Sequence, residues 1–496
     1  MIDEIPSEVA PGRWRELLST QHFFATVTVS LGIVLFAFNA FLVSTALPSA
    51  VTGLGGAELL SWATSLYLVF SIVGGSSTAT LVHRLGTRRL FSLGALAFLA
   101  GTLAAALASS MPVLLAGRAL QGLAAGVIEA GCYVLIPRLF PSRLIPKVFG
   151  VEAIVWALAA FGGPVLAGWL AEAVSWRASF LAAVPMVLVL WAMVPIVAPP
   201  GRGEESEKQV PWLRLAALAL GMLLVTLASI VASNVGKVAV LALAALVFWV
   251  TVVGDGRGEV RLFPANAFRF TSAAGLGYWT AFIMPMAQAS ESVFLIYSLQ
   301  YLWFYSPLEA GLVASVMALS WSGTQFLQAN FGSPALRRHF IWLGPALLIV
   351  GLACVVLALP LASLPLIVLA QALVGAAFGM NWSALSQTMM EAASPDERDA
   401  TSALLPTVQA AGYGVGAAVF GVIGNMLAYA GADAAALLSD MMVVFAAATA
   451  LSALAVVTAA GMVKLLMRPY LSRNGLDRTG AIARTADQMP LPATFA

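Results

Sequence analysis

The chain has 496 residues, of which 60% are hydrophobic and only 10% are charged, and its net charge is +2. Soluble domains carry about 25% charged residues, so this composition excludes a soluble globular protein and indicates an integral membrane protein. The charges form no basic patch interleaved with aromatic residues, which argues against a nucleic-acid partner. The two cysteines, Cys132 and Cys354, lie in separate apolar stretches and are expected to be buried core residues.

Apolar runs of about twenty residues predict membrane-spanning helices, because a helix of that length crosses the hydrocarbon core of a bilayer. The mostly polar first twenty residues lack a basic start and a small-residue cleavage site, so we expect the first run to be a retained span. In chain order, the sequence predicts fourteen spans, at residues 23–49, 59–81, 89–109, 112–137, 148–172, 179–198, 212–233, 236–254, 268–303, 307–330, 339–360, 363–389, 400–428 and 438–466.

The positions of lysine and arginine bear on this count. If both termini are cytoplasmic, 22 of the 25 lysines and arginines fall in inner loops and tails. The exceptions are Arg118, Arg177 and Lys237. Because basic residues gather on the cytoplasmic side, this distribution predicts an even number of spans in the inner (plasma) membrane, with both termini cytoplasmic.

The chain contains an internal repeat. Residues 116–126 resemble residues 369–379, with five of eleven positions identical at an offset of 253. Parallel repeats of this kind build many secondary transporters. We therefore expect an all-α membrane protein of two six-helix halves with two inserted helices. The expected parts are a cytoplasmic N-terminal segment at 1–22, a first half at 23–198, a linker with two extra transmembrane helices at 199–266, a second half at 267–467 and a disordered cytoplasmic tail at 468–496.

Three ionisable residues fall deep within predicted spans, namely Arg118, Glu129 and Glu291. An ionised side chain at the bilayer centre costs about 2.5–3.5 kcal/mol on insertion scales, so each is expected to face a protein interior or a watery cavity. Arg118 and Glu129 share one helix face about 16 Å apart, too far for direct contact. Either acid could carry protons, because an acid that is costly to bury when charged suits that role, or could be a static member of the bundle. In the repeat, Arg118 becomes Gln371 and Glu129 becomes Trp382.

Four short motifs follow one another along the chain. They are Arg118-Ala-Leu-Gln-Gly122, Gly163-Pro164 with Gly168, Ser175-Trp-Arg-Ala-Ser-Phe180 and Ser306-Pro-Leu-Glu-Ala-Gly311. In their order and spacing they resemble the major facilitator superfamily, in particular its fourteen-span drug:proton antiporter family, over nearly the whole chain. The resemblance implies that Arg118 lies in the proton pathway. It also implies that Gly163, Pro164 and Gly168 form a hinge typical of exporters.

The loop after the second span departs from the family pattern. His83 stands where the family has an aspartate that joins a charge cluster latching the two halves on the cytoplasmic side. A histidine cannot supply a fixed negative charge, although it can titrate near neutral pH. We expect a cytoplasmic gate loop with a changed or absent latch, formed by His83, Arg84, Gly86, Arg88 and Arg89.

The first span departs as well, because Asn39 stands where many relatives carry an acid. Asparagine cannot bind and release a proton, so proton coupling is not expected at that position. Other polar and aromatic residues within the spans line a cavity or merely join helices. The candidates for a substrate cavity are Asn39, Gln121, Trp156, Gln288, Gln371 and Trp382. Glu152 and Glu391 are expected near cytoplasmic helix ends, as interfacial or loop-pairing residues.

The sequence lacks a phosphate-binding loop, a His-Glu-x-x-His pair and a Gly-x-Ser-x-Gly turn, so no ATP, metal, cofactor or enzymatic activity is expected. It predicts a secondary transporter that exports amphipathic organic molecules or drugs by alternating access, in exchange for protons. The expected partners are a small-molecule substrate, protons and the lipid bilayer, joined in a Gram-negative host by an adaptor and an outer-membrane channel. The alternatives are a facilitator, or a dedicated metabolite or siderophore transporter, with lost or altered proton coupling. A non-transporting membrane scaffold is a remote alternative.

Overall fold

The computed structural model describes residues 12–54, 59–198, 211–228, 231, 233–258, 261–330, 333–427 and 433–473. Every regular element in these ranges is a helix, which confirms the predicted all-α class. Helices suit apolar runs in a bilayer because each helix satisfies its own backbone hydrogen bonds. The part of the predicted disordered tail beyond Arg473 lies outside the described residues.

The first part of the chain forms a bundle around α5. Within it, α5 packs against α3 and α4, while α2 packs against α6 and α8. The predicted sixth span is divided into two helices, α7 and α8. The bounds are α1 Trp14–Leu17, α2 Phe23–Leu54, α3 Leu60–Leu85, α4 Thr87–Ala106, α5 Met111–Leu139, α6 Ile145–Ala173, α7 Trp176–Leu181 and α8 Val184–Val197.

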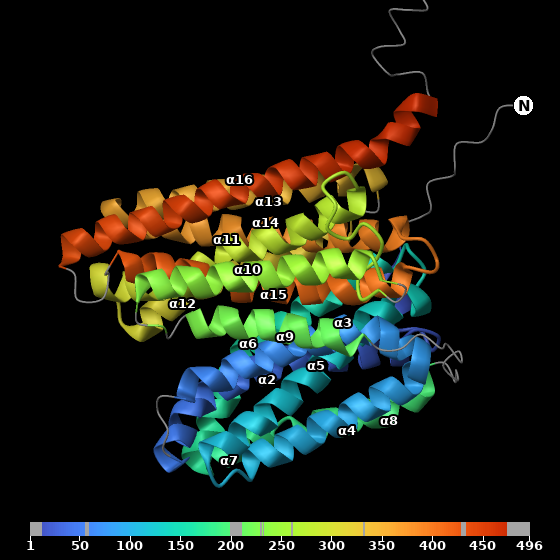
Figure 1. Cartoon of the computed structure of the whole chain (residues 1–496), viewed down its shortest axis with the longest axis horizontal. Helices are drawn as coiled ribbons and strands as arrows, with labels where there is room; N and C mark the ends of the chain where they lie inside the picture. The colour runs from blue at the N-terminus through green and yellow to red at the C-terminus, as the bar shows by residue number, and fades with distance from the viewer. Residues whose placement is uncertain are drawn as a thin grey trace, which may run out of the picture.

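Two inserted helices, α9 (Trp212–Ala228) and α10 (Asn234–Gly256), follow this bundle. They pack against each other, and α9 contacts α3 from the first part and α15 from the last part of the chain. Figure 1 shows α9 and α10 lying across the front, between the two bundles. The buried carboxylate of Asp255 holds the end of α10, because it accepts a hydrogen bond from Arg214 of α9 at 2.7 Å.

The last part of the chain forms a second bundle, in which α14 packs against α12 and α13, and α16 packs against α11 and α13. This second bundle lies above the first in Figure 1. The two bundles meet where α12 and α14 contact α6, and where α15 contacts α3 and α5. The bounds are α11 Ala273–Leu302, α12 Pro307–Gln328, α13 Pro334–Leu361, α14 Leu364–Ala392, α15 Arg398–Met426 and α16 Ala434–Arg473.

We call α2–α8 the first half and α11–α16 the second half. We call the latch end the end of the bundle at which α5 ends, at Leu139, and at which α6 and α15 begin, at Ile145 and Arg398. These names describe helix packing only, and the domain boundaries placed from the sequence stay predictions.

Glycines set the close approach of α5 to α3. A Cβ atom added at Gly122 would strike the backbone carbonyl of Tyr67, and one added at Gly126 would strike that of Ser71. Small residues four apart on one helix face let two helix backbones approach closely, which is how membrane helices gain packing energy without a hydrophobic driving force.

The same device recurs in the second half, between α14 and α12. A Cβ atom added at Gly375 would strike the carbonyl of Met317, and one added at Gly379 would meet that of Trp321 at 2.6 Å. Gly375 and Gly379 stand at the repeat offset from Gly122 and Gly126. The sequence repeat therefore corresponds to a repeated helix contact.

Eleven helices of the described residues are long and apolar enough to cross a membrane. The apolar stretches Phe23–Asn39 of α2 and Trp212–Ala228 of α9 are shorter. The remaining predicted span, α11, is a helix of 30 residues that carries Glu291. The fold therefore contains eleven to fourteen spanning helices, and the count of fourteen stays a prediction.

Replacement of Gly126 by alanine tests the glycine contact. We expect Gly126→Ala to lower the free energy of unfolding by about 1–3 kcal/mol, because the added methyl group forces two helix backbones apart. Gly421→Ala in α15 is the matched control, because a Cβ atom there meets nothing within 4 Å. Thermal unfolding in detergent gives both values, and equal stabilities would contradict the close packing of α5 on α3.

Candidate functional site

Arg118 is buried in α5, with 1% of its surface exposed. Its Nη1 donates hydrogen bonds to Asn39 Oδ1 at 2.6 Å and to Gln121 Oε1 at 2.8 Å, and its Nε donates to the Ala63 carbonyl at 3.2 Å. The guanidinium carbon lies 4.2 Å from the centre of the Tyr67 ring. The structure thus brings Arg118 together with two of the predicted cavity residues.

Asn39 presents only a neutral amide to this cation. Its Nδ2 is buried and has no hydrogen-bond partner. Among the described residues, no carboxylate forms an ion pair with Arg118. The positive charge is therefore stabilised by amide and carbonyl dipoles and by an aromatic face, which is an unusual arrangement for a buried cation.

Glu291 has the corresponding environment in the second half. It is 3% exposed, its Oε1 accepts a hydrogen bond from Gln371 Nε2 at 2.8 Å, and its Oε2 has no partner. Gln371 is the repeat equivalent of Arg118, and Gln288 lies one helical turn before Glu291. Each half thus holds one buried ionisable group against an amide side chain.

Glu129 lies on α5, ten residues before Leu139 and hence about 15 Å from the latch end. It is 9% exposed and makes no hydrogen bond or ion pair with another described residue. Trp156 of α6 packs edge-on against Phe36, with ring centres 6.3 Å apart. Glu129 is not among the residues that contact Arg118, as the sequence predicted.

The expectation for Glu152 was wrong. Instead of lying at a membrane interface, its side chain is buried, with 2% exposed, and its Oε2 accepts a hydrogen bond from Tyr133 at 3.3 Å. The indole of Trp382 donates to the Tyr133 hydroxyl at 3.2 Å. The error arose because α6 begins at Ile145, with Pro146 in its first turn, rather than at 148. Proline is favoured in the first turn of a helix, so Pro146 was the available signal.

The predicted hinge residues Gly163, Pro164 and Gly168 lie inside α6, which is continuous across them. Proline cannot donate its backbone hydrogen bond, so the helix is weakened there. A Cβ atom added at Gly168 would meet no other atom within 4 Å, so close packing does not explain that glycine. The hinge itself stays a prediction.

An ion pair joins the two halves at the latch end. Arg138 of α5 binds both carboxylate oxygens of Asp399 of α15. Its Nε donates to Oδ1 at 3.0 Å, and its Nη2 donates to Oδ2. Arg138 Nη1 also donates to Thr87 at 3.2 Å. His83 Nε2 lies 3.8 Å from Asp399 Oδ2. The negative charge of the latch therefore comes from Asp399, a residue that no sequence motif singled out, and not from position 83.

The other residues of the gate loop take no part in this ion pair. Gly86 has φ of 75° between α3 and α4, a left-handed value that favours glycine. Arg84, Arg88 and Arg89 are exposed, and none of them forms an ion pair with a described residue.

Further hydrogen bonds join the halves close to this ion pair. Gln325 of α12 donates to the Phe149 carbonyl at 2.8 Å, and Ser322 donates to the Ala153 carbonyl at 2.9 Å. Gln387 of α14 donates to the Ser142 carbonyl at 2.9 Å. Within the described residues, every hydrogen bond between the halves lies within about three helical turns of the latch end.

Helix α1 also contacts both halves at the latch end. Trp14 donates to Asn330 at 2.9 Å, and Lys147 of α6 donates to the same oxygen at 2.6 Å. Glu16 pairs with Arg143 at 2.7 Å. A hydrogen bond from the Arg13 backbone and the charge of Arg143 hold the pKa of Glu16 below its usual range. Helix α1 is therefore part of the closed latch end.

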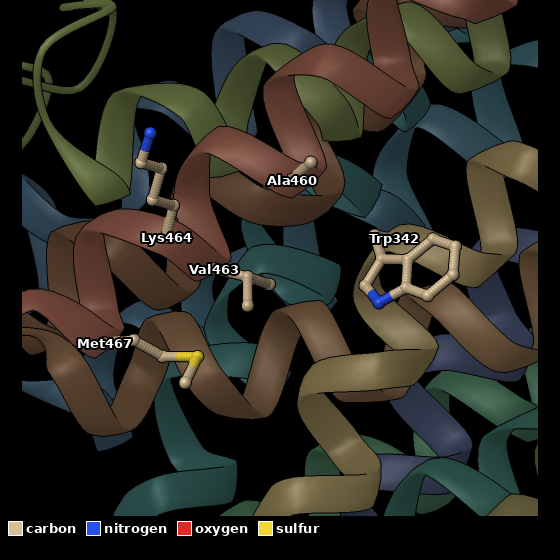
Figure 2. A pocket seen from close by; sticks show the side chains of 5 residues that line it. All are labelled: Trp342, Ala460, Val463, Lys464 and Met467. Atoms are coloured by element: carbon tan, nitrogen blue, oxygen red, sulfur yellow. The ribbon is translucent and has the colours of Figure 1, made fainter. Parts of the chain in front are cut away.

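A surface crevice of about 350 Å³ lies between α13 and α16. Figure 2 shows its lining side chains, from Trp342 on one helix to Lys464 and Met467 on the other. It contains none of the predicted site residues, so the candidate site is the buried set of charges and not this crevice.

Comparison with known proteins identifies the family of this chain. The family model of the Major Facilitator Superfamily matches residues 29–417. A Mycobacterium tuberculosis protein named "Probable multidrug-efflux transporter" is 29% identical over 426 residues, which are 84% of this chain and 90% of that protein.

Two solved structures have a similar fold. The human organic anion transporter MFSD10 has a TM-score of 0.65 at 15% identity, covering 90% of this chain and 100% of that one. The proton:xylose symporter XylE has a TM-score of 0.60 at 16% identity, covering 88% and 94%.

The chain belongs to the major facilitator superfamily. It is a multi-pass membrane transporter and not an enzyme, as the family and these structural neighbours are transporters.

Substitution of Asn39 tests whether Arg118 lacks a counter-charge. We expect Asn39→Asp to raise the free energy of unfolding by about 1 kcal/mol, because a carboxylate at this position would supply the opposite charge that the buried guanidinium lacks. Asn39→Leu should lower it by about 1–3 kcal/mol, because the buried guanidinium loses an acceptor. Thermal unfolding in detergent measures both, and a destabilising Asn39→Asp would show that the charge is already compensated.

Removal of the latch charge should open the latch end. With a single cysteine at Ala153 in a background without Cys132 and Cys354, Asp399→Asn should speed maleimide labelling about fivefold, the effect of losing an ion pair worth about 1 kcal/mol. Glu309→Gln is the control, because Glu309 is exposed and its hydrogen bonds to Ser306 stay within the second half. Equal labelling rates in Asp399→Asn and wild type would rule out a latch role.

Proposed function

We propose that this chain is a secondary active transporter that exports amphipathic organic molecules across the inner (plasma) membrane by alternating access, in exchange for protons. One observation carries the proposal: the acids Glu129 and Glu291 and the cation Arg118 are buried in the two halves without ion-pair partners among the described residues. The name of the 29% identical relative supports efflux as the direction.

The latch end faces the cytoplasm in this proposal, with both termini on the same side. Support comes from the excess of lysine and arginine in the loops at this end. The described conformation is then closed toward the cytoplasm, because the hydrogen bonds between the halves gather there. The hinge at Gly163, Pro164 and Gly168 would allow the halves to rock.

Glu291 and Glu129 carry the protons. Each is costly to keep charged inside the bundle, because an isolated ionised carboxylate loses its hydration and gains no cation. A proton neutralises the acid, and water or substrate on one side of the membrane allows it to ionise again. Gln371 can serve both states of Glu291, since its amide donates to a carboxylate and also to the carbonyl oxygen of a carboxylic acid.

Arg118 holds the polar end of the cavity in the first half. Together with Asn39 and Gln121 it presents a fixed positive field near Tyr67. The aromatic rings of Trp156 and Trp382 and the amides of Gln288 and Gln371 are the remaining proposed cavity groups. Flat apolar molecules with a polar end suit such a lining.

A second candidate function is a facilitator of the same fold without proton coupling. Asn39 favours it, because the residue next to Arg118 is an amide that cannot titrate. In that case substrate moves down its own gradient, and Glu291 and Glu129 are static hydrogen-bonding groups.

Conversion of the two acids to amides separates these functions. In proteoliposomes with an internal pH dye, we expect ethidium, a lipophilic cation, to evoke proton movement with the wild type. Glu291→Gln or Glu129→Gln should reduce this movement by about tenfold, because the amide cannot bind a proton. Exchange of ethidium for ethidium should persist in the variant that is affected.

Glu309→Gln is the control, because Glu309 is exposed and caps α12 through Ser306. Ethidium flux without proton movement in any of these proteins would leave the facilitator as the function.

A further inference from the structure

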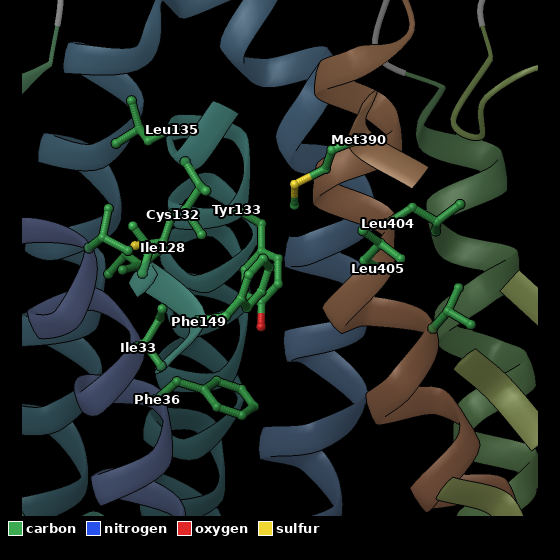
Figure 3. Packing of buried hydrophobic residues seen from close by; sticks show 14 of the residues in the cluster. Ile33, Phe36, Ile128, Cys132, Tyr133, Leu135, Phe149, Met390, Leu404 and Leu405 are labelled. Atoms are coloured by element: carbon green, nitrogen blue, oxygen red, sulfur yellow. The ribbon is translucent and has the colours of Figure 1, made fainter. Parts of the chain in front are cut away.

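A chain of three side chains crosses from the second half to the first near the latch end. Trp382 of α14 donates its indole N–H to the Tyr133 hydroxyl of α5 at 3.2 Å, and Tyr133 donates its O–H to Glu152 of α6 at 3.3 Å. Figure 3 shows Tyr133 and Phe149 close to each other within the buried cluster. The rings of Tyr133 and Trp382 meet edge-on at 6.2 Å.

Glu152, at the inner end of this chain, has only one hydrogen-bonded oxygen. Its Oε1 is buried and has no partner, and no ion pair to Glu152 is present among the described residues. In its ionised form this carboxylate would be held in an apolar bundle by a single phenol. The described closed arrangement therefore favours the neutral acid.

The ionisable neighbours of Glu152 all come from α5. Glu129 stands one helical turn before Tyr133, so the two share a helix face. Tyr133 is hydrogen-bonded to Glu152, and the other ionisable side chains within electrostatic range of Glu152 are Glu129 and Cys132. Of the described residues in α1, α2, α7, α12 and α14, which also pack against α6, none adds a charged group to this set.

Opening of the latch end would expose Glu152. Separation of the halves pulls α14 from α5, and the hydrogen bond from Trp382 to Tyr133 has to break. The neighbouring bonds from Ser322 to Ala153 and from Gln325 to Phe149 have to break as well. Water then reaches the residue next to Ala153, which is Glu152, and can solvate its carboxylate.

We propose that Glu152 is the proton-release group of the latch end, neutral while Trp382 and Tyr133 bridge the halves and ionised when that bridge opens. This inference rests on the proposed proton exchange and adds a third acid to it. The step is a simple proton transfer: the carboxyl O–H bond of Glu152 breaks, and the proton passes to water or buffer at the latch end. The electron pair stays on the carboxylate, and Tyr133 keeps its proton and continues to donate to Glu152.

Release of this proton should shift the conformation of the bundle even without a substrate. If the closed state binds one more proton than the open state, the open-to-closed ratio rises by up to about tenfold for each pH unit in the titration range. Glutamine at position 152 mimics the permanently neutral acid. It should shift the open-to-closed ratio toward the closed state, most strongly at high pH.

The test is a pair-distance measurement with spin labels at Ser142 and Ala335, which are exposed at the latch end of the first and second halves. Full-length protein in nanodiscs is measured between pH 5 and 9, a span of about two units on either side of neutrality. In the wild type, the long-distance population should grow with rising pH. In Glu152→Gln this growth should fall well below that of the wild type, and in Glu152→Asp it should return.

Two further variants separate Glu152 from its surroundings at the latch end. His83 is another ionisable group at the latch end, and its Nε2 lies 3.8 Å from Asp399 Oδ2. His83→Gln should keep the pH response that depends on Glu152. Trp382→Phe removes the indole donor but keeps an aromatic ring, and it should shift the response toward the open state at lower pH.

A pH response in Glu152→Gln equal to that of the wild type would overturn the inference, as would a wild type whose distances ignore pH. The fate of the proposed exchange is read separately, from ethidium-evoked proton movement in proteoliposomes. If that movement is present in the wild type and unchanged in Glu152→Gln, the exporter proposal stands and the role of Glu152 falls. If it is absent while the latch end still responds to pH through Glu152, proton exchange falls and Glu152 remains a proton-sensitive group.

Discussion

Three carboxyl groups and one guanidinium are held inside an apolar helix bundle without an oppositely charged partner among the described residues. Three of these groups are hydrogen-bonded to neutral side chains: Arg118 and Glu291 to amides, and Glu152 to a phenol. A buried charge without a counter-charge is costly, so its stability depends on whether a proton or water is present. In the proposed mechanism, the conformation of the bundle is therefore linked to protonation, which a bundle with fully paired charges would not provide.

In the proposed mechanism, contacts at the latch end couple the protonation of these buried groups to the relative position of the two halves. Ion pairing between Arg138 and Asp399 and the hydrogen bonds of Gln325 and Gln387 join the halves at the latch end, where the polar contacts between the described parts of the halves gather. Glycine contacts such as that of Gly126 with α3 pack the helices of each half closely, which suits movement of each half as one body in the proposed mechanism. Rigid-body rocking about a central site is the usual route to alternating access in repeat-built transporters.

Much of this arrangement could be predicted from the sequence, because it depends on period and composition. Apolar runs located the helices, and the repeat around residues 116–126 anticipated matched helix contacts that the glycines of α5 and α14 realise. The side-chain partners could not be predicted in the same way. Asp399 meets Arg138 across 261 positions of the chain, and Glu152 was misplaced because the start of α6 was set three residues late. Tertiary contacts of this range leave no periodic signal in a single sequence.

The proposed transporter uses a proton gradient to move its substrate uphill, and this coupling is the central claim. The most direct measurement is the accumulation of ethidium in wild-type proteoliposomes under an imposed pH difference, with the membrane potential clamped and protein-free liposomes as the reference. Proton-coupled export predicts accumulation above the level at equilibrium, and its collapse on addition of a protonophore. Equilibration of ethidium to the same level with and without the pH difference would contradict it.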